Sequence, residues 1–574
     1  MNIFQEPLNA KIICPFRGKK INWDVVFPLI LITTVVITRI PFMSKFLYEW
    51  DSVNYAMALS NYNILQQQPH PPGYIFYVAL GRGFNLLFND PNTSLIAMAI
   101  TFTAMSAVLL YFMTQDIFSR KVGILSSILF IFNPLIWFYG EIASIYIFEA
   151  FFSILIGYTC YNLFKGDERF IYISAVVLGL AGGFRTDIVE FMLPLWIICI
   201  LHAKPSFTKV ITGMGVFALS ILSWLIPTAL SVGGIHEYLQ LLRTTSAAAD
   251  YTSILFGASI SQQILNSGAC ILWSLLGLTV IGILAVLYFL IQRRDVLKND
   301  LGFHLKKPLT LFFLLWACPA FTFYLVVYVV KPGYLLTCIP AFMIILAYII
   351  TRISGLINIR FPSISSKKAL VSILTIYILF NTVYFIYPWD IHNGAIWETP
   401  TDKMETSQEL WFDTDVGLIY NNAKISANDE NTALHIQNIL NISNSDPSGT
   451  IIVIRDINRE DEGFNWRKAM YYLPGYDFYY LFDEENSGIT GNVSMWHGKN
   501  HNYTTSKSKT LAVPMNSATT RIVWIMSNQT SFYQEVKKEV GVNSIELPNG
   551  LNIYYSQIGN QTSSFQISGF IFQR

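Results

Sequence analysis

Residues 93–114 read TSLIAMAITFTAMSAVLLYFMT and contain no charged side chain. An α-helix needs about 20 apolar residues to cross the ~30 Å hydrocarbon layer of a membrane, so this run predicts a spanning helix. Similar runs recur along the first two thirds of the chain, and the first lacks a small-residue cleavage site, which favours a retained helix over a removed signal peptide. The sequence therefore predicts about eleven spans, over residues 25–42, 93–116, 122–140, 142–164, 170–184, 188–202, 209–230, 262–291, 308–330, 334–351 and 369–387.

The overall composition agrees with a chain that lies mostly in lipid. Apolar residues make up 53% of the chain and charged residues 13%, whereas a soluble domain carries about a quarter charged residues. The formal net charge of +1 argues against nucleic acid as a partner, because binding to a phosphate backbone needs a basic surface. No cysteine lies beyond residue 388, so a domain there must fold without disulfides.

Lysine and arginine residues in the short connections give the orientation, because such residues concentrate on the cytoplasmic side of a membrane. Basic residues precede the first span and follow each even-numbered span, which predicts a multi-pass protein of the cell membrane with a cytoplasmic N-terminus. If the run 73–88 also crossed the membrane, every later basic cluster would lie on the outer side. We therefore predict that this run lies at the outer interface. An odd number of spans then places residues 388–574 outside, where the sequence has five N-glycosylation sequons, at Asn441, Asn492, Asn502, Asn528 and Asn560.

Two domains are predicted. Residues 1–387 form a transmembrane domain with a first outer loop at residues 43–92, and residues 388–574 form a soluble extracytoplasmic domain. In the soluble domain, β-rich runs and helical patterns occur in turn, at Thr450–Ile454, Phe464–Tyr472, Thr520–Met526, Thr530–Val540 and Gly550–Tyr555. The predicted fold class is therefore mainly α, a polytopic helical membrane bundle with a C-terminal α/β domain.

The first outer loop is the segment that is richest in reactive side chains. It contains Tyr48-Glu49-Trp50-Asp51-Ser52-Val53-Asn54-Tyr55 after the first span, and then Pro69-His70-Pro71-Pro72-Gly73-Tyr74. Carboxylates beside aromatic rings at the mouth of a helix bundle suit a polar, ring-shaped substrate, and a carboxylate there can act as a general base or hold a divalent cation. The structural alternative is that Glu49 and Asp51 cap the next helix while Trp50 lies at the membrane interface.

Charged residues near the outer ends of the spans are further candidates for a site. Three positive charges lie where the positive-inside rule does not predict them, at Arg39, Arg185 and Lys331. Each could instead extend to the lipid headgroups, and Asp187 could simply pair with Arg185. Glu141 and Glu149 lie at or within the outer half of the predicted fourth span, where ionisable residues usually face the protein interior or a wet cavity.

These segments resemble the GT-C fold of lipid-dependent glycosyltransferases, which includes the protein O-mannosyltransferases and the aminoarabinose transferase of lipid A. The resemblance in the N-terminal third rests on the first-loop acid, the Pro-Pro turn and the outer-interface helix. It is closer to a prokaryotic branch of that superfamily, through Trp50-Asp51-Ser52-Val53-Asn54-Tyr55, His70-Pro71-Pro72-Gly73-Tyr74, Gly182-Gly183-Phe184-Arg185-Thr186-Asp187, Lys331-Pro332-Gly333-Tyr334-Leu335-Leu336 and Ala469-Met470-Tyr471-Tyr472-Leu473-Pro474-Gly475-Tyr476.

The resemblance implies a hexosyl- or pentosyltransferase that moves a sugar from a polyprenyl phosphate, such as dolichyl phosphate, to a protein, lipid or glycan acceptor on the outer face. It implies that Asp51, the acidic residue of the first loop, is the catalytic residue and acts as a base. Better-known members often have a second acidic residue where this chain has Ser52, and Glu49 is the candidate for that charge. A divalent cation, Mg²⁺ or Mn²⁺, with Asp51 as a ligand is compatible with this reading. The residues implied for substrate binding, with the cations on the lipid phosphate, are His70, Arg185, Asp187, Lys331, Arg39 and Glu141.

Two other functions stay open from the sequence. A secondary transporter would also have many spans and buried charges, but such transporters have two similar halves and this sequence shows no internal repeat. A catalytically inactive protein, in which the bundle anchors a binding domain, is the other alternative, and Ser52 is the residue that keeps it open. Neither the sugar nor the class of acceptor follows from the sequence.

Overall fold

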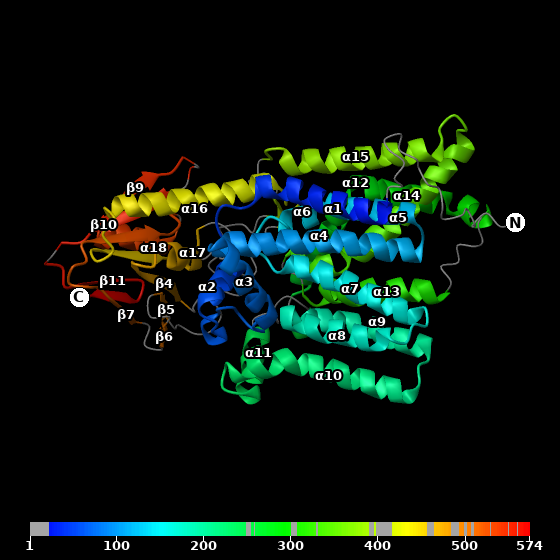
Figure 1. The fold of residues 1–574 in the computed structure, drawn as a ribbon. Helices are drawn as coiled ribbons and strands as arrows, with labels where there is room; N and C mark the ends of the chain where they lie inside the picture. The colour runs from blue at the N-terminus through cyan, green and yellow to red at the C-terminus, as the bar shows by residue number, and fades with distance from the viewer. Residues whose placement is uncertain are drawn as a thin grey trace.

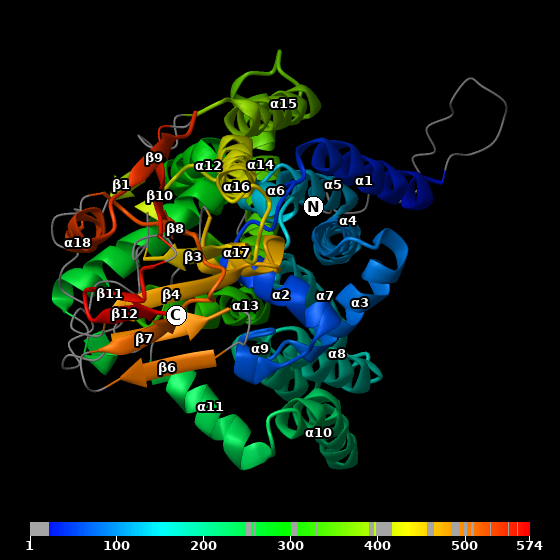
Figure 2. The ribbon, with the colours of Figure 1, turned by 90° about the vertical axis from the view of Figure 1, so that its left-hand side faces the viewer.

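The computed structural model has an elongated shape, with a bundle of long helices at one end and a sheet-containing part at the other (Figure 1). Figure 2 views the molecule from the end at which the sheet lies. The structure describes residues 22–247, 254–257, 259–299, 307–328, 331–389, 395–397, 416–455, 464–483, 493–498, 502–506, 510–528, 530–548, 550, 552–559 and 561–574. The basic residues before the first span, and the sequon positions Asn492 and Asn560, lie outside these ranges.

Nine helices among the described residues are long and apolar enough to cross a membrane. They coincide with nine of the eleven predicted spans, because long apolar runs are stable in lipid only when every backbone group is bonded within a helix. These helices are α1 (Trp23–Arg39), α4 (Pro91–Ile117), α7 (Tyr146–Phe164), α9 (Thr186–Ala203), α10 (Phe207–Leu230), α12 (Ile260–Asn299), α13 (Lys307–Val326), α14 (Ile339–Arg360) and α15 (Ser366–Ile386). The predicted boundary after residue 387 falls just beyond the end of α15.

The two remaining predicted spans are not long single helices. The run 170–184 forms α8 (Phe170–Phe184), an apolar helix of 15 residues. The run 122–140 is divided into α5 (Arg120–Ile131) and α6 (Pro134–Tyr139). The prediction of one unbroken helix there is wrong, because the Asn133 side chain accepts hydrogen bonds from the next amides, at Leu135 and Ile136, and so begins a new helix.

The predicted first outer loop, residues 43–92, contains three elements. They are α2 (Trp50–Ser60), η2 (Ile64–Gln66) and α3 (Ile75–Phe88), the last of which is the helix that the sequence predicts at the outer interface. Glu49 is the N-cap residue of α2, and its backbone N–H donates to the Ser52 hydroxyl over 3.1 Å. Ser52 therefore helps to start the helix that carries Asp51. The other short elements are η1 (Ile40–Phe42), α11 (Ile235–Ala247), η4 (Ile254–Phe256) and η5 (Pro332–Thr337).

The C-terminal part is an α/β structure around a seven-stranded sheet of order β6-β5-β4-β3-β8-β10-β9. Its strands are β3 (Thr450–Ile454), β4 (Asp477–Asp483), β5 (Val493–His497), β6 (Asn502–Ser506), β8 (Arg521–Ile525), β9 (Asn543–Glu546) and β10 (Asn552–Gln557). The central strand β3 is parallel to both neighbours, and all of its residues are buried, as expected for a strand covered on both faces. The predicted strands over 450–454, 520–526 and 550–555 are confirmed as β3, β8 and β10.

Helices cover both faces of this sheet. One face packs against α16 (Asn422–Ile442) and α17 (Trp466–Tyr472). The other face packs against α18 (Ser531–Glu539) and a small sheet of β11 (Ser564–Ile567), β12 (Phe570–Gln573) and β7 (Leu511–Pro514). A further pair, β1 (Ala395–Trp397) and β2 (Val416–Gly417), lies outside these layers.

The first outer loop and the C-terminal part meet at one end of the helical bundle. Trp50 and Met57 of α2 pack against the core that α16, α17 and the sheet share. Figure 1 shows α2 and α3 at the end of the long helices that faces the sheet. The loop and the C-terminal part are therefore neighbours in space, while the side of the membrane on which they lie stays a prediction.

Candidate active site

Asp51 lies in the first turn of α2, at the junction between the bundle and the C-terminal part. Its side chain is 26% exposed. Oδ1 lies 3.2 Å from Nδ1 of His70, and Oδ2 lies 4.0 Å from the ammonium nitrogen of Lys331. The structure therefore brings together three residues that are far apart in the sequence.

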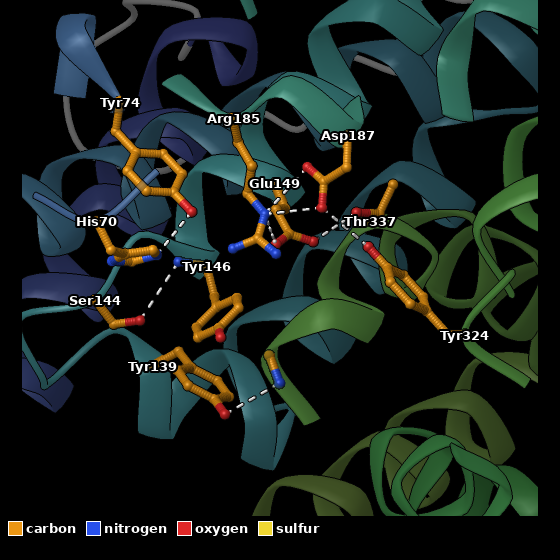
Figure 3. Close-up of polar contacts among 11 residues, drawn as sticks. His70, Tyr74, Tyr139, Ser144, Tyr146, Glu149, Arg185, Asp187, Tyr324 and Thr337 are labelled. Carbon is orange, nitrogen blue, oxygen red and sulfur yellow. Dashed lines mark hydrogen bonds and ion pairs between the residues drawn. The ribbon is translucent and has the colours of Figure 1, made fainter. Parts of the chain in front are cut away.

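The His-Pro-Pro-Gly-Tyr turn positions His70. Gly73 has a φ of +106°, and a Cβ there would lie 2.6 Å from a methyl group of Ile64, so the turn requires glycine. The next residue, Tyr74, places its hydroxyl 2.9 Å from Nε2 of His70 (Figure 3). His70 is thus held between Tyr74 on one ring nitrogen and Asp51 on the other.

Lys331 forms an ion pair with Glu49. Its ammonium nitrogen lies 2.7 Å from Oε2 of Glu49, whose side chain is almost fully buried. Lys331 directly precedes η5, where the amide of Gly333 donates to the Tyr139 hydroxyl over 3.0 Å. A Cβ on Gly333 would overlap the ring of Tyr146, so glycine allows the backbone beside Lys331 to approach these tyrosines closely.

Arg185 lies at the corner between α8 and α9 and contacts two carboxylates. Its Nε lies 2.7 Å from Oε1 of Glu149 and 3.0 Å from Oδ2 of Asp187. Its guanidinium carbon lies 5.0 Å from the ring centre of Tyr146 and 4.7 Å from that of Tyr334, distances typical of cation–π contacts. In Figure 3 one terminal nitrogen of Arg185 points to the side on which His70 and Tyr74 lie.

Hydroxyl groups hold the two carboxylates that bind Arg185. Thr337 donates to Oε2 of Glu149 over 2.7 Å, and Tyr324 donates to Oδ2 of Asp187 over 3.3 Å (Figure 3). Since each acid also contacts Arg185, the arginine side chain has little freedom to move. A buried charge is stable only with such partners.

Two glycines before Arg185 bring this corner close to its neighbours. A Cβ on Gly182 would lie 2.7 Å from the ring of Trp224, and a Cβ on Gly183 would overlap the ring of Phe76. Phe76 belongs to α3, which directly follows the turn that carries His70. The Gly-Gly-Phe-Arg-Thr-Asp motif therefore packs the Arg185 corner against the helix that leads away from His70.

The surroundings of Asp51 lower the pKa of its carboxyl group. Burial raises this pKa, but the positive charges of His70, Lys331 and Arg185 together lower it by more. Asp51 is therefore ionised at neutral pH. An ionised carboxylate that is still partly exposed can accept a proton or a hydrogen bond from a substrate group.

Arg39 and Glu141, which the sequence also places in the site, lie in a different cluster. Both side chains are fully buried, and both contact Trp137: the guanidinium carbon of Arg39 lies 4.8 Å from its ring centre, and Glu141 accepts its indole N–H over 2.7 Å. Arg39 also donates to the carbonyl of Ile131. Their assignment as substrate-binding residues stays a prediction, and the described contacts do not bring them to Asp51.

The residues around Asp51 do not fit a divalent cation. The Lys331 ammonium group, 2.7 Å from Glu49 and 4.0 Å from Asp51, places a fixed positive charge between the two carboxylates. Among the described residues, no three or more His, Cys, Asp or Glu side chains are grouped as metal ligands. Mg²⁺ and Mn²⁺ prefer sites rich in oxygen ligands, which Asp51 and Glu49 cannot offer while Lys331 lies between them.

The tyrosines of the site are missed by sequence reasoning. Tyr139, Tyr146, Tyr324 and Tyr334 are all close to the charged residues, yet tyrosine is common throughout this chain and only Tyr334 belongs to a motif that the sequence singles out. Glu149 was recognisable as an acid within a span, but its pairing with Arg185 was not. The only usable signal was Tyr334 within the Lys-Pro-Gly-Tyr motif.

A family model matches part of the chain. Residues 59–209 match the model described as the N-terminal domain of the protein O-mannosyl-transferase TMEM260. The matched region includes His70, Glu149, Arg185 and Asp187, and it begins after Asp51. No sequence among curated proteins matches the chain significantly.

Solved structures are similar over most of the chain. ArnT from Cupriavidus metallidurans bound to undecaprenyl phosphate gives a TM-score of 0.52 at 10% sequence identity, over 94% of this chain and 98% of that one. The same protein in the apo state gives 0.50 at 10% identity, over 93% and 97%. The oligosaccharyltransferase AglB from Archaeoglobus fulgidus, in complex with an inhibitory peptide and a dolichol-phosphate, gives 0.41 at 13% identity, over 93% and 74%.

The family model and the similarity to ArnT confirm the resemblance to GT-C glycosyltransferases, while the closer resemblance to a prokaryotic branch stays a prediction. Both ArnT structures align with nearly the whole length of this chain. This chain therefore has the GT-C fold of membrane glycosyltransferases, and its residues 59–209 match the N-terminal domain of a protein O-mannosyl-transferase.

Proposed function

We propose that this chain, a membrane glycosyltransferase of the GT-C type, transfers one sugar from a polyprenyl-phosphate donor to an acceptor on the extracytoplasmic face of the membrane. The observation that carries the proposal is the position of Asp51: an ionised, partly exposed carboxylate close to Lys331 and Arg185. A base and cations for a phosphate leaving group are the two components that such a transfer requires. The undecaprenyl phosphate bound to ArnT supports a lipid phosphate as the donor carrier.

In the proposed mechanism Asp51 is the general base. The acceptor donates a proton to Asp51 while its oxygen or nitrogen attacks the anomeric carbon of the sugar. The bond from that carbon to the phosphate oxygen breaks, its electron pair leaves with the polyprenyl phosphate, and the configuration at the carbon inverts. The contact of Oδ1 with His70 supports this role, because it favours the ionised carboxylate and leaves Oδ2 for the acceptor.

Lys331 and Arg185 are proposed to bind the lipid phosphate. A leaving polyprenyl phosphate gains negative charge, which a nearby cation stabilises most strongly in the transition state. Arg185 contacts its two carboxylates through Nε, so its terminal nitrogens can reach an anion. Lys331 lies next to Asp51 and would supply the positive charge that a divalent cation supplies in metal-dependent enzymes.

The experiment is a transfer assay with the purified full chain in lipid. Polyprenyl phosphates that carry different radiolabelled sugars are incubated with peptide, lipid and glycan acceptors. We expect label to leave the lipid for at least one donor, and Asp51→Asn to reduce this transfer at least about a hundredfold, the usual lower cost of losing a general base.

The matched control is Asp90→Asn, in the same outer loop. Asp90 is exposed and caps α4, and asparagine is an equally good capping residue, so this variant should transfer normally. Both variants should insert in the membrane at wild-type levels. Near-normal transfer by Asp51→Asn would show that the base lies elsewhere, and a wild-type protein that leaves every donor intact would contradict the proposed function.

A further inference from the structure

Residues 44–48 connect η1 to α2 without forming a helix or a strand, and we call them the connecting segment. Only two residues separate this segment from Asp51, so the path of the segment decides where Asp51 lies. Buried backbone amides in an irregular segment need partners from elsewhere in the protein. Most of the partners here come from the C-terminal part of the chain.

Asp429 of α16 binds the connecting segment at three points. Its Oδ2 accepts the amide of Lys45 over 2.8 Å. Its Oδ1 accepts the amide of Phe46 over 3.1 Å and the hydroxyl of Ser44 over 2.8 Å. Asp429 is only 8% exposed, so water competes weakly for these hydrogen bonds.

Two further hydrogen bonds extend this contact to the end of the segment. The amide of Leu47 donates to the Tyr472 hydroxyl over 2.8 Å, and the side-chain amide of Asn428 donates to the carbonyl of Tyr48 over 3.2 Å. Every residue from Ser44 to Tyr48 is therefore bonded to α16 or α17. The same two helices pack against one face of the seven-stranded sheet in the C-terminal core.

A buried lysine fixes α16 and α17 to each other. The Lys468 ammonium group donates to Asn428 over 2.8 Å and to Thr432 over 3.1 Å. Its neighbour Arg467 donates to the carbonyl of Gln66 over 2.9 Å and lies over the ring of Trp50, which directly precedes Asp51. The C-terminal part thus contacts both the connecting segment before α2 and Trp50, the first residue of α2.

We infer that Asp429 is a positioning residue for the proposed reaction, which holds the connecting segment so that Asp51 meets the acceptor and the donor sugar in the correct geometry. The inference rests on the proposed role of Asp51 as the base. Asp429 acts through the backbone of residues 45 and 46, not by contact with a substrate. A displacement of about 1 Å in a reacting group can cost about a hundredfold in rate, so a tether at this position matters for the chemical step.

The test combines kinetics with amide hydrogen exchange on the full chain in lipid. Asp429→Ala removes all three hydrogen bonds; we expect kcat to fall about tenfold to a hundredfold with little change in the KM of the donor. The amides of Lys45 and Phe46 should exchange faster. Asp429→Asn keeps one acceptor oxygen and should lie between Asp429→Ala and the wild type in both measurements.

The matched control is Glu430→Gln, which changes the exposed neighbour of Asp429 on the same helix and should alter neither measurement. If the amides of Asp429→Ala exchange as in the wild type, the tether is refuted. If they exchange faster while kcat is unchanged, the positioning role is refuted. A wild-type protein without transferase activity would refute the proposed function instead, and the positioning role with it, whereas the exchange data would still decide whether the tether exists.

Discussion

Arg185 and Arg39 occupy equivalent places in the sequence, each at the predicted outer end of a span, yet their surroundings differ. Arg39 is fully enclosed: it lies over the ring of Trp137, it donates to the Thr38 hydroxyl and to the carbonyl of Ile131, and its acidic neighbour Glu141 is buried as completely as Arg39 itself. Arg185 retains 7% exposure and contacts two carboxylates and two tyrosine rings. The same residue type at the same predicted depth therefore has two kinds of environment.

The difference shows that the contacts of a buried arginine indicate its role. The contacts of Arg39 tie the end of α1 to α5 and α6, which is a packing role. The partners of Arg185 come from α7 and α9, and its positive charge also acts on Asp51. A cation that contacts two acids directly and keeps some exposure suits ligand binding, whereas one that is fully enclosed together with its acidic neighbour favours a structural role.

The sharpest test of this contrast is Arg185→Gln. The change removes the charge that we propose binds the lipid phosphate, and hydrogen bonds to charged groups contribute about 1.5–3 kcal/mol. We therefore expect kcat/KM for the donor to fall about tenfold to a hundredfold in the transfer assay. Arg185→Lys retains the charge and should recover part of this loss.

Arg39→Gln is the matched comparison. Loss of one partner from a buried charged cluster costs about 3–5 kcal/mol, so this variant should melt at a lower temperature in a thermal-shift measurement. The KM of the donor should not change, because the contacts of Arg39 are with Trp137 and Ile131. An Arg39→Gln protein that loses donor affinity as strongly as Arg185→Gln would break the distinction between the two arginines.

Lys331→Met should have the next largest effect. It removes the positive charge between Glu49 and Asp51, and we expect transfer to fall about tenfold, the effect of roughly 1.4 kcal/mol. Wild-type transfer should be unchanged by EDTA, since Lys331 lies between the carboxylates that a metal would need. Strong inhibition of the wild type by EDTA, reversed by Mg²⁺ or Mn²⁺, would contradict this arrangement.

His70→Ala should produce the smallest change, and only at acidic pH. His70 lowers the pKa of Asp51, so its removal raises that pKa and moves the acidic limb of kcat/KM to higher pH. Activity on the alkaline side of that limb should change little. Tyr74→Phe, which keeps His70 and removes only a hydroxyl, is the control; an acidic limb that stays in place in His70→Ala would show that His70 does not act on Asp51.

Much of the fold follows from the sequence because apolar length and charge placement are local signals. Nine spans and the strands β3, β8 and β10 are found where the patterns predict them. The break at Asn133 was missed because an isolated Asn-Pro pair within an apolar run can either cap a new helix or be tolerated in a continuous one. The packing around it, including the hydrogen bond from Asn133 to the carbonyl of Gly277, is not local.

The candidate site was only partly predictable, because many of its contacts join residues that are distant in the sequence. His70, Arg185, Asp187 and Lys331 belong to motifs; the structure brings His70 and Lys331 to Asp51 and pairs Arg185 with Asp187. Arg39 carried the same signal as Arg185, because the position of a residue along a helix does not reveal which neighbours the helix will have. The contact between Asp429 and the connecting segment joins residues 385 positions apart, and no periodicity in either segment indicates it.

The hydrogen bonds of Asp429 also impose an order on biosynthesis. The connecting segment is made early, but its acceptor emerges from the ribosome 385 residues later, which at about 5–20 residues per second takes about 20–80 s. During that interval the connecting segment lacks its hydrogen bonds to α16 and α17, so the start of α2 is held only by its contacts within the bundle. A chain truncated before α16 would therefore present Asp51 without this tether, and under the proposed mechanism its rate of transfer should be reduced.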